Sequence, residues 1–457
     1  MAPRSYRSVL DSVRVFPLER VIATAHIEDV EASVAAEFQR LYPLGNELSG
    51  LRIGITAVSR QVANYVRLLR AAIAQLRARG ATVAVLPAIG SHGKGTAEGA
   101  IQTLQHYGIT EASVGAPILA GPETEHVATV EGVRVACAKS VLQDLDGVFL
   151  FGRVRRHWDI RWAPGEAETL GCYPLESGLS KLFLGMAMLE AKALHDHGER
   201  LGWAVQTAAR RLLLEPRVNV IGALAVVDTE EEQTALVRGI PFRLGTEHGN
   251  PSEFFRREHE VLQASRAFLP WLPFSDEDAD LLYLHYFGKP YAGQGADPKI
   301  IGRNGGTRNW CSGTPRFHRI CASRLIGARD QKQHRGPFNA MGIGSLDFVT
   351  RRFYEAVDWE LTKLNAVTAG CPRSAEAPRI AETDRAMLEI AIAERPSPLQ
   401  PARMMFAVST VWMRLLYLSE AYYEQANALL GFRIRGEPQP IPFDRAGFVD
   451  FPAFEHI

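Results

Sequence analysis

Two histidines in this sequence follow apolar runs, at positions from which a side chain can reach a ligand. In "VLPAIGSHGKGTAEGAIQTL" (residues 85–104), the apolar run stops at Pro87 and small residues surround His92. His157 lies just past the apolar run of "FLFGRVRRHWDI". Histidine gains and loses a proton near neutral pH, and small flanking residues let a substrate approach. The pair is a candidate acid and base, although a locally bonded loop histidine and a solvated basic loop are the ordinary alternatives.

The glycine-rich stretch around His92 could also be a phosphate-binding loop, but its residues do not support that interpretation. A Walker loop requires GxxxxGK[ST], so that backbone N–H groups, the lysine and a magnesium-binding hydroxyl converge. Here Lys94 is followed by Gly95, and no GxGxxG fingerprint follows Ala57. An anion at the start of the helix predicted from Thr96 is compatible with the sequence, but it specifies little.

Lys181 lies in the first turn of an apolar helix pattern, within "ESGLSKLFLGMAMLEAKALHDHG". Burial and the helix dipole disfavour a cation there, which lowers the pKa of the amine and makes it a better nucleophile or attachment point. Spacing alone favours a lysine that extends along the helix edge. The pattern ends with His195 and His197, a spacing that suits one metal ligand and a neighbouring partner better than two ligands on one helix face.

Two basic loop residues are suited to holding a substrate carboxylate. Arg60 lies in "TAVSRQVANY", at a predicted strand-to-helix turn, where a guanidinium can bind a carboxylate through two hydrogen bonds. Lys289 lies in the Gly- and Pro-rich stretch "YFGKPYAGQGADPKIIGRNGG" (residues 286–306). Basic surface loops are common, so simple solvent exposure is the alternative for the second loop.

The elements that must position these residues begin with a βαβ unit. The apolar runs "LRIGITA" and "TVAVLPA" flank "VANYVRLLRAAIAQLRARG", which has helical spacing and ends at a glycine. Such units predict a parallel sheet whose ligands lie at the carboxyl ends of the strands. Further strands are predicted at residues 133–138, 147–154 and 218–228, and helices at Gly178–Leu194 and Glu199–Leu214.

The sequence between Leu236 and Ala279 is rich in Pro and Gly, which predicts a linker. The chain is therefore predicted to divide into two domains, residues 1–265 and 266–457. The second domain is predicted to open with a strand at 280–288, to continue with helices at 352–369 and 402–430, and to end in a Pro- and Phe-rich tail that wraps a surface groove. The predicted fold class is α/β, with two domains built on mainly parallel sheets flanked by helices.

Composition indicates small partners. The chain has 457 residues, and its 51 Lys and Arg balance 51 Asp and Glu, so a global attraction to nucleic acid or to an anionic membrane is not expected. No apolar run reaches 18 residues, which predicts no membrane span, and five scattered cysteines without a CxxC pair indicate reduced thiols. We expect a cytoplasmic protein, and the sequence leaves an oligomer open.

Taken in order, these motifs resemble the nickel-dependent lactate racemase family. The motifs span roughly residues 54–303 and are "TAVSRQVAN", "PAIGSHGKGTAEG", "YGIT", "GRVRRH", "ESGLSK", "HDHG" and "GKPYAGQGADPKIIGR". The resemblance implies a two-domain isomerase with its active site in the interdomain cleft. It also implies a nickel-pincer nucleotide, a pyridinium mononucleotide derivative attached covalently to the lysine that maps to Lys181. The nickel-binding histidine maps to His195, with His197 as the adjacent choice.

The reaction implied by the resemblance is racemisation or epimerisation of a 2-hydroxy acid by proton-coupled hydride transfer. His92 and His157 would exchange protons with the substrate, while Arg60 and Lys289 would hold its carboxylate. Enzymes that build the cofactor are the implied protein partners.

Two departures from the lactate enzymes bear on the substrate. The interval from His157 to Lys181 is longer, and "SGLS" replaces the arginine and glycines that usually precede the lysine. These differences favour a larger 2-hydroxy acid, such as a sugar acid, over lactate. They leave open an oxidoreductase, a nickel-free acid/base dehydratase and a non-catalytic binder of an anionic metabolite.

Overall fold

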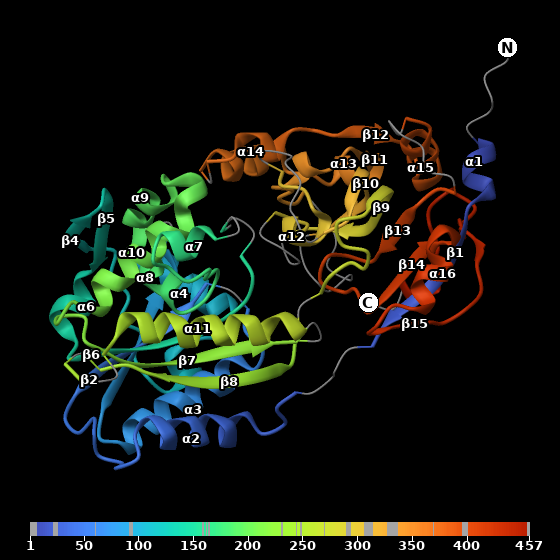
Figure 1. Ribbon diagram of the computed structural model, residues 1–457. Coiled ribbons are helices and arrows are strands. Elements are labelled where there is room, and N and C mark those ends of the chain that lie inside the picture. Colours follow the sequence, from blue (N-terminus) through green and yellow to red (C-terminus); the bar gives the residue numbers. More distant parts are fainter. Residues whose placement is uncertain are drawn as a thin grey trace. The chain divides into compact units, whose positions relative to one another are not determined.

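A computed structural model describes most of the chain, in two compact units (Figure 1). The described residues are 7–21, 26–59, 61–90, 95–157, 160, 162, 165–229, 232–243, 245–246, 249–268, 270–288, 294–305, 314–326, 337–368, 370–394 and 401–454. The first unit comprises Ala23–Leu269, and the second combines Met1–Ile22 with Pro270–Ile457. Helices pack against a mainly parallel sheet in the first unit and against a mixed sheet with a parallel half in the second, so the predicted α/β class is confirmed.

The first unit is built on a five-stranded sheet in the order β3-β2-β6-β7-β8. The first four of these strands are parallel, and β8 is antiparallel to β7. Its strands are β2 (Arg52–Val58), β3 (Thr82–Ala88), β4 (Thr124–Val130), β5 (Val133–Ala138), β6 (Gly147–Arg153), β7 (Val220–Asp228) and β8 (Thr234–Pro241). Its helices are α2 (Val30–Leu41), α3 (Tyr65–Ala78), α4 (Ala97–His106), α5 (Glu111–Val114), α6 (Lys139–Asp144), α7 (Glu166–Thr169), α8 (Ser180–Met186), α9 (Ala191–His195), α10 (Leu201–Leu213) and α11 (Pro251–Ser265).

The predicted βαβ unit is confirmed as β2, α3 and β3, and the strands predicted at 133–138, 147–154 and 218–228 correspond to β5, β6 and β7. β5 does not join the main sheet, because it pairs antiparallel with β4 in a separate ribbon.

β6 shows why an unbroken apolar run forms a central strand. Its alternate side chains enter two cores, Val148 and Leu150 on the side of α8, α10 and α11, and Phe149 and Phe151 on the side of α2 and α3.

The single helix predicted over residues 178–194 is instead three short segments. α8 ends at Met186, a 3₁₀ turn spans Met188–Glu190, and α9 follows. Met188 has a positive φ of 50°, a backbone conformation that stops an α-helix. Helical spacing of apolar residues continues across the break, so the sequence pattern did not reveal it.

The linker predicted between Leu236 and Ala279 is wrong, because this region contains edge strand β8 and the 15-residue helix α11. The Pro and Gly residues that suggested a linker mark the ends of elements. Asn250 caps α11 with its side chain and Pro251 occupies the first helical position, where proline is favoured. Phe254 and Phe255 are then fully buried against the core of the first unit.

The second unit contains a nine-stranded sheet in the order β12-β11-β10-β9-β13-β14-β1-β15, with β16 also paired to β1. The strands from β12 to β13 are parallel, and the remaining pairs are antiparallel. The strands are β1 (Arg14–Arg20), β9 (Asp278–Phe287), β10 (Arg316–Leu325), β11 (Phe348–Thr350), β12 (Arg379–Ala381), β13 (Met404–Ala407), β14 (Leu415–Ser419), β15 (Phe432–Ile434) and β16 (Gln439–Pro440). The helices are α1 (Arg7–Ser12), α12 (Pro298–Ile301), α13 (Arg351–Glu355), α14 (Trp359–Thr368), α15 (Asp384–Ala393) and α16 (Tyr423–Asn427).

The membership of β1 changes the predicted domain division. Residues 1–265 were expected to form one domain, but β1 is hydrogen-bonded between β14 and β15, with Phe16 opposite Leu418 and Leu18 opposite both Leu416 and Ile434. The first 22 residues therefore belong with the C-terminal part of the chain, and the boundary between the units falls at 269/270. A local sequence pattern identifies a strand but not a partner about 400 residues away.

Three further expectations for the second unit differ from the structure. The region from 402 to 430, predicted as a long helix, forms β13, β14 and the short helix α16. The tail, predicted to wrap a surface groove, instead pairs with β1 through β15 and β16, and Phe451 and Phe454 are buried in the core of the second unit. The helix predicted over 352–369 is divided into α13 and α14.

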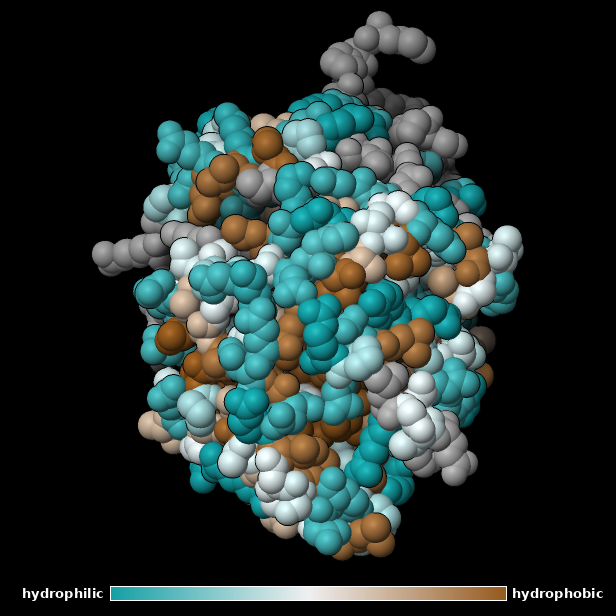
Figure 2. All heavy atoms as spheres, turned by 90° about the vertical axis from the view of Figure 1, so that its left-hand side faces the viewer, coloured by the Kyte–Doolittle hydropathy of each residue, from teal (hydrophilic) through white to brown (hydrophobic). Residues whose placement is uncertain are grey.

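The surface drawn in Figure 2 mixes hydrophilic residues with smaller groups of hydrophobic residues. Across the described ranges, no helix is both long enough and apolar enough to traverse a bilayer.

Candidate active site

Three of the predicted site residues, Arg60, His92 and Lys289, lie outside the described residues. They follow β2, β3 and β9, as the sequence pattern indicated. The described part of the candidate site is formed by the segment after β6 and by the helices from α8 to α10, which carry the other four predicted residues.

His157 is held by the segment that leads into α8. Arg155 and Ser177 exchange two backbone hydrogen bonds of 2.9 and 3.1 Å, which form an antiparallel bridge. The backbone N–H of His157 donates to Oε2 of Glu176 at 2.6 Å. His157 is therefore tied to the strand-like stretch that ends three residues before α8, and the same stretch fixes the approach to Lys181.

The ring of His157 has a defined proton arrangement. Its Nδ1 lies 3.2 Å from the backbone N–H of Ile160, which can only donate, so Nδ1 acts as the acceptor. This contact assigns the ring proton of a neutral imidazole to Nε2, an assignment made from hydrogen bonding. In this arrangement His157 presents an N–H donor from Nε2.

Lys181 is the second residue of α8 and is half-buried. α8 packs directly on the end of β3, because a Cβ at Gly185 would collide with the backbone carbonyl of Ala88. Gly90, two residues after the end of β3, lies close to α9, since a Cβ at Gly90 would be 3.8 Å from the Ala191 side chain. These backbone approaches bring α8 and α9 against the segment that leads to His92.

Glu258, which the sequence analysis did not identify, anchors the start of α8. Both of its carboxylate oxygens lie 3.1 Å from the backbone N–H of Ser180, and the Ser180 hydroxyl donates to Oε2. Glu258 is only 2% exposed, and burial raises its pKa to about 7 against the opposing effect of the Ser180 hydrogen bonds. Its spacing of four residues from Phe254 and three from Val261 places it on the buried face of α11. This spacing is the available sequence signal, which the neighbouring Pro and Gly residues obscure.

The Lys181 ammonium lies near enough to His195 to affect the pKa of its ring. Burial of the ring, followed by repulsion from the Lys181 ammonium and a smaller effect of Lys192, lowers the pKa of His195 to about 4, although Asp196 opposes this. The His195 side chain is nevertheless exposed to solvent at the surface. His195 is therefore neutral at physiological pH, which is the form of histidine that binds metals.

His197 faces a different neighbour. Its ring lies edge-on to Trp203, with centroids 5.8 Å apart, and the Arg200 guanidinium lies 4.2 Å from the Trp203 centroid. Among the described residues, three or more His, Cys, Asp or Glu side chains do not gather into a metal-binding group.

A second pair missed by the sequence analysis links the carboxyl ends of β6 and β7. Arg153 Nη1 lies 3.3 Å from Oδ2 of Asp228, and the same oxygen accepts a hydrogen bond from the backbone N–H of Ala63. Both residues end an apolar strand, which was the available signal. The pair ties the segment that precedes α3 to the strand ends where the candidate site lies.

Comparison with known proteins gives little further information. No protein-family model matches the sequence, and no curated protein matches it significantly. A crystal structure of a Thermotoga maritima protein, determined by a structural genomics consortium, is similar with a TM-score of 0.44 and 12% identity, over 77% of this chain and 87% of that one.

Proposed function

We propose that this protein is a racemase or epimerase of a 2-hydroxy acid and that Lys181 is the attachment point of a nickel-pincer nucleotide. The observation that supports the proposal most is that the Lys181 ammonium lies near enough to His195 to lower the pKa of its imidazole, after burial has done so. The resemblance of the motifs to nickel-dependent lactate racemases assigns the same two residues to the cofactor. Neither a nickel-free acid/base enzyme nor an anion binder requires this pair.

The described residues fit the cofactor. The Lys181 amine would form the covalent attachment, and the imidazole of His195, neutral above about pH 4, would be the protein ligand to nickel. Because the pincer itself supplies carbon and sulfur donors, one histidine suffices and a cluster of three protein ligands is not required. When bound, the cofactor supplies hydride acceptance from the carbon that bears the substrate hydroxyl.

The protein's own residues would orient the substrate and move its protons. Neutral His157 presents Nε2–H and would donate a hydrogen bond to the substrate oxygen, and its protonated imidazolium form would supply the acid. His92 would then be the base that takes the hydroxyl proton. Arg60 and Lys289 would bind the carboxylate and fix the carbon between the two imidazoles. The long segment between His157 and Lys181 favours a substrate larger than lactate, such as a sugar acid.

The proposal is tested by the mass of the intact protein. Protein produced together with the cofactor-building enzymes is expected to carry a covalent adduct and nickel, with the adduct on the peptide that contains Lys181. Lys181→Ala should remove the adduct. Lys192→Ala is the matched control, because Lys192 lies on the neighbouring helix, is exposed and pairs with Asp196 at 2.8 Å, and it should leave the adduct in place. His195→Ala should keep the adduct and lose nickel.

Activity is measured as stereochemical inversion across a panel of 2-hydroxy acids, and a substrate deuterated at the carbon that bears the hydroxyl should keep its deuterium, because hydride transfer returns the same hydrogen. His92→Ala should abolish inversion without removing the adduct. Wild-type protein that gains neither adduct nor nickel under these conditions contradicts the proposal and favours acid/base chemistry or simple binding. An adduct that persists in Lys181→Ala refutes the assignment of the attachment residue.

A further inference from the structure

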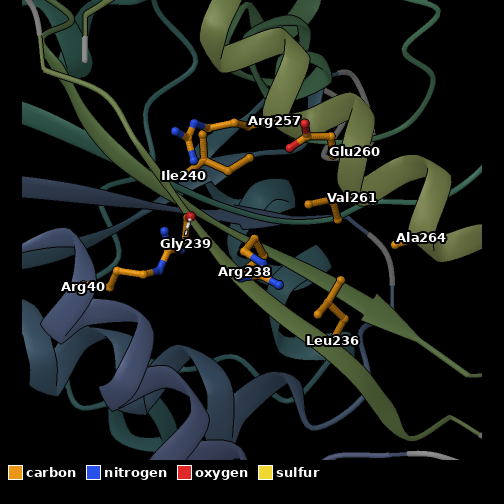
Figure 3. A pocket seen from close by; sticks show the side chains of 9 residues that line it. All are labelled: Arg40, Leu236, Arg238, Gly239, Ile240, Arg257, Glu260, Val261 and Ala264. Carbon is orange, nitrogen blue, oxygen red and sulfur yellow. Dashed lines mark hydrogen bonds between the residues drawn. The ribbon is translucent and has the colours of Figure 1, made fainter. Parts of the chain in front are cut away.

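A pocket of about 320 Å³ between β8 and α11 is lined in part by arginines that already have partners (Figure 3). Arg40 donates to the backbone carbonyl of Gly239 at 2.7 Å, and Nε of Arg257 donates to Glu253 at 2.7 Å. None of the candidate site residues lines this pocket. The contacts that bear on the proposed reaction lie instead in the segment after β6.

Three consecutive residues shortly before α8 hold the backbone around His157. Ser177 exchanges two backbone hydrogen bonds with the residue two positions after the end of β6. The Glu176 carboxylate accepts the backbone N–H of His157 at 2.6 Å. The carbonyl of Leu175 accepts Nε1 of Trp162 at 2.8 Å. Residues 175–177 therefore bind one partner each along the segment from 155 to 162.

Glu176 is the member of this group whose residue type matters. Ser177 and Leu175 contribute backbone groups, which any non-proline residue at these positions would retain. The bond to His157 uses the carboxylate of Glu176, and a charged acceptor makes a shorter and stronger hydrogen bond than a neutral one. A substitution at 176 can therefore release the backbone of His157 and leave the two neighbouring links in place.

Ile160 fixes the other side of the His157 ring. Its side chain is 1% exposed in the core of the first unit, and it packs so closely on α10 that a Cβ at Gly202 would be 3.0 Å from its Cγ2. Its backbone N–H donates to Nδ1 of His157 at 3.2 Å. This bond is at the long end of the normal range, so a small displacement of the His157 backbone would break it.

We propose that Glu176 is a positioning residue for His157. By holding the backbone N–H of His157, it keeps Nδ1 in place as the acceptor of the Ile160 N–H, so that the ring proton of the neutral imidazole stays on Nε2. Nε2–H is the group that would meet the substrate oxygen. The catalytic consequence rests on the proposed function, whereas the effect of Glu176 on the ring does not depend on it.

Nitrogen NMR of the cofactor-free, full-length protein with ¹⁵N-labelled histidine measures the tautomer. At about pH 8, where an ordinary imidazole is neutral, wild-type His157 should carry its proton on Nε2. Glu176→Ala should give a mixture of the two tautomers. Glu176→Gln keeps an oxygen acceptor and should keep the wild-type tautomer. The signal that disappears in His157→Gln is that of His157.

Glu168→Ala is the matched control for the tautomer. Glu168 is an exposed glutamate of α7, in the same segment between His157 and Lys181. Its removal takes away one carboxylate without touching the backbone of His157, so the signal of His157 should be that of the wild type. Circular dichroism melts of each variant check that folding is preserved.

Kinetics of the cofactor-loaded enzyme measure the consequence for the reaction. Glu176→Ala should lower kcat for inversion about a hundredfold, because a displaced acid no longer meets the substrate oxygen, and should change KM less than about twofold. Glu176→Gln should lose about tenfold at most. The adduct on Lys181 should form in both variants.

Two results would overturn the inference: a wild-type tautomer in Glu176→Ala, or a Glu176→Gln variant that loses the tautomer as fully as Glu176→Ala does, since charge rather than a held backbone would then govern the ring. Wild-type protein that gains neither adduct nor nickel, while its variants show the expected tautomers, contradicts the proposed function and supports the role of Glu176. The two proposals therefore fail by different results.

Discussion

At the residue scale, burial and then the Lys181 ammonium lower the pKa of His195 in the candidate site. Burial alone lowers the pKa of the imidazole, and the ammonium lowers it further because two cations repel each other. His195 therefore stays neutral in mildly acidic solution, where an unperturbed histidine is protonated. Nickel binding through His195 should for this reason persist below pH 6.5 and be lost only as the pH falls toward about 4.

The effect of Lys181 on the pKa of His195 predicts how a Lys181 variant titrates in cofactor-free protein. In Lys181→Met, the pKa of His195 should rise toward its ordinary value, because the larger of the two repelling charges is gone. NMR titration of the His195 ring in cofactor-free protein measures this shift. Lys192→Met should produce a smaller rise, since Lys192 has the weaker effect and is paired with Asp196. An unchanged midpoint in Lys181→Met would show that the two groups are not coupled.

At the element scale, α8 is positioned by contacts that lie outside its own sequence. Glu258 from α11 binds the Ser180 N–H, and the carbonyl of Ala88 in β3 lies against Gly185. An acidic side chain at the start of a helix satisfies donors that the helix itself leaves unpaired. Two elements far apart in sequence thus determine where Lys181 lies.

Glu258 makes the stability of the first unit depend on pH. Burial raises its pKa from 4.5 to about 7, so the folded state holds the proton more tightly than the unfolded state. The resulting stabilisation is fully present below about pH 4.5 and is lost as the pH rises through about 7, with an amplitude of about 3 kcal/mol. Glu258→Gln removes this titration, so the stability of the variant relative to that of the wild type should be higher at pH 8 than at pH 5.

Hydrogen exchange of peptides from the first unit at the two pH values, corrected for intrinsic exchange rates, measures the effect. Glu260→Gln is the control, because Glu260 lies on the same helix with a side chain that is 59% exposed and should give the same pH dependence as the wild type. A wild-type stability that does not fall between pH 5 and pH 8 would contradict the raised pKa.

At the scale of the whole molecule, the two ends of the chain form one unit. β1 lies between β14 and β15, and Phe16 and Leu18 are fully buried in the core of the second unit. The N-terminal residues therefore stabilise the part of the chain that begins about 250 residues later, although the first unit lies between them in sequence.

Phe16→Ala should destabilise the second unit by about 3–5 kcal/mol, because a large, fully buried side chain is lost from a packed core. Hydrogen exchange should accelerate in peptides from Pro270–Ile457 and stay unchanged in Ala23–Leu269. Val21→Ala is the control, since Val21 is 52% exposed and should have little effect. Equal loss of protection in both units would contradict the division of the chain.

The sequence by itself determined those elements whose signal is local. β2, α3 and β3, together with β6, β7 and β9, follow from apolar runs and helical spacing, because burial on both faces of a strand or on one face of a helix leaves a pattern within about ten residues. The positions of His157, Lys181 and His195 as candidates followed from residue type and from those elements.

Only the tertiary structure decided which distant segments meet. β1 joins β14 and β15, Glu258 reaches Ser180, and Lys181 lies near enough to His195 to lower its pKa, and no local pattern encodes these relations. Pro251 and its neighbours indicated a linker because proline is found both in linkers and in first helical turns, and only the burial of Phe254 and Phe255 distinguishes them. The physical reason is that partner choice depends on the free energy of burial summed over the whole core, whereas a sequence window reports only the preferences of its own residues.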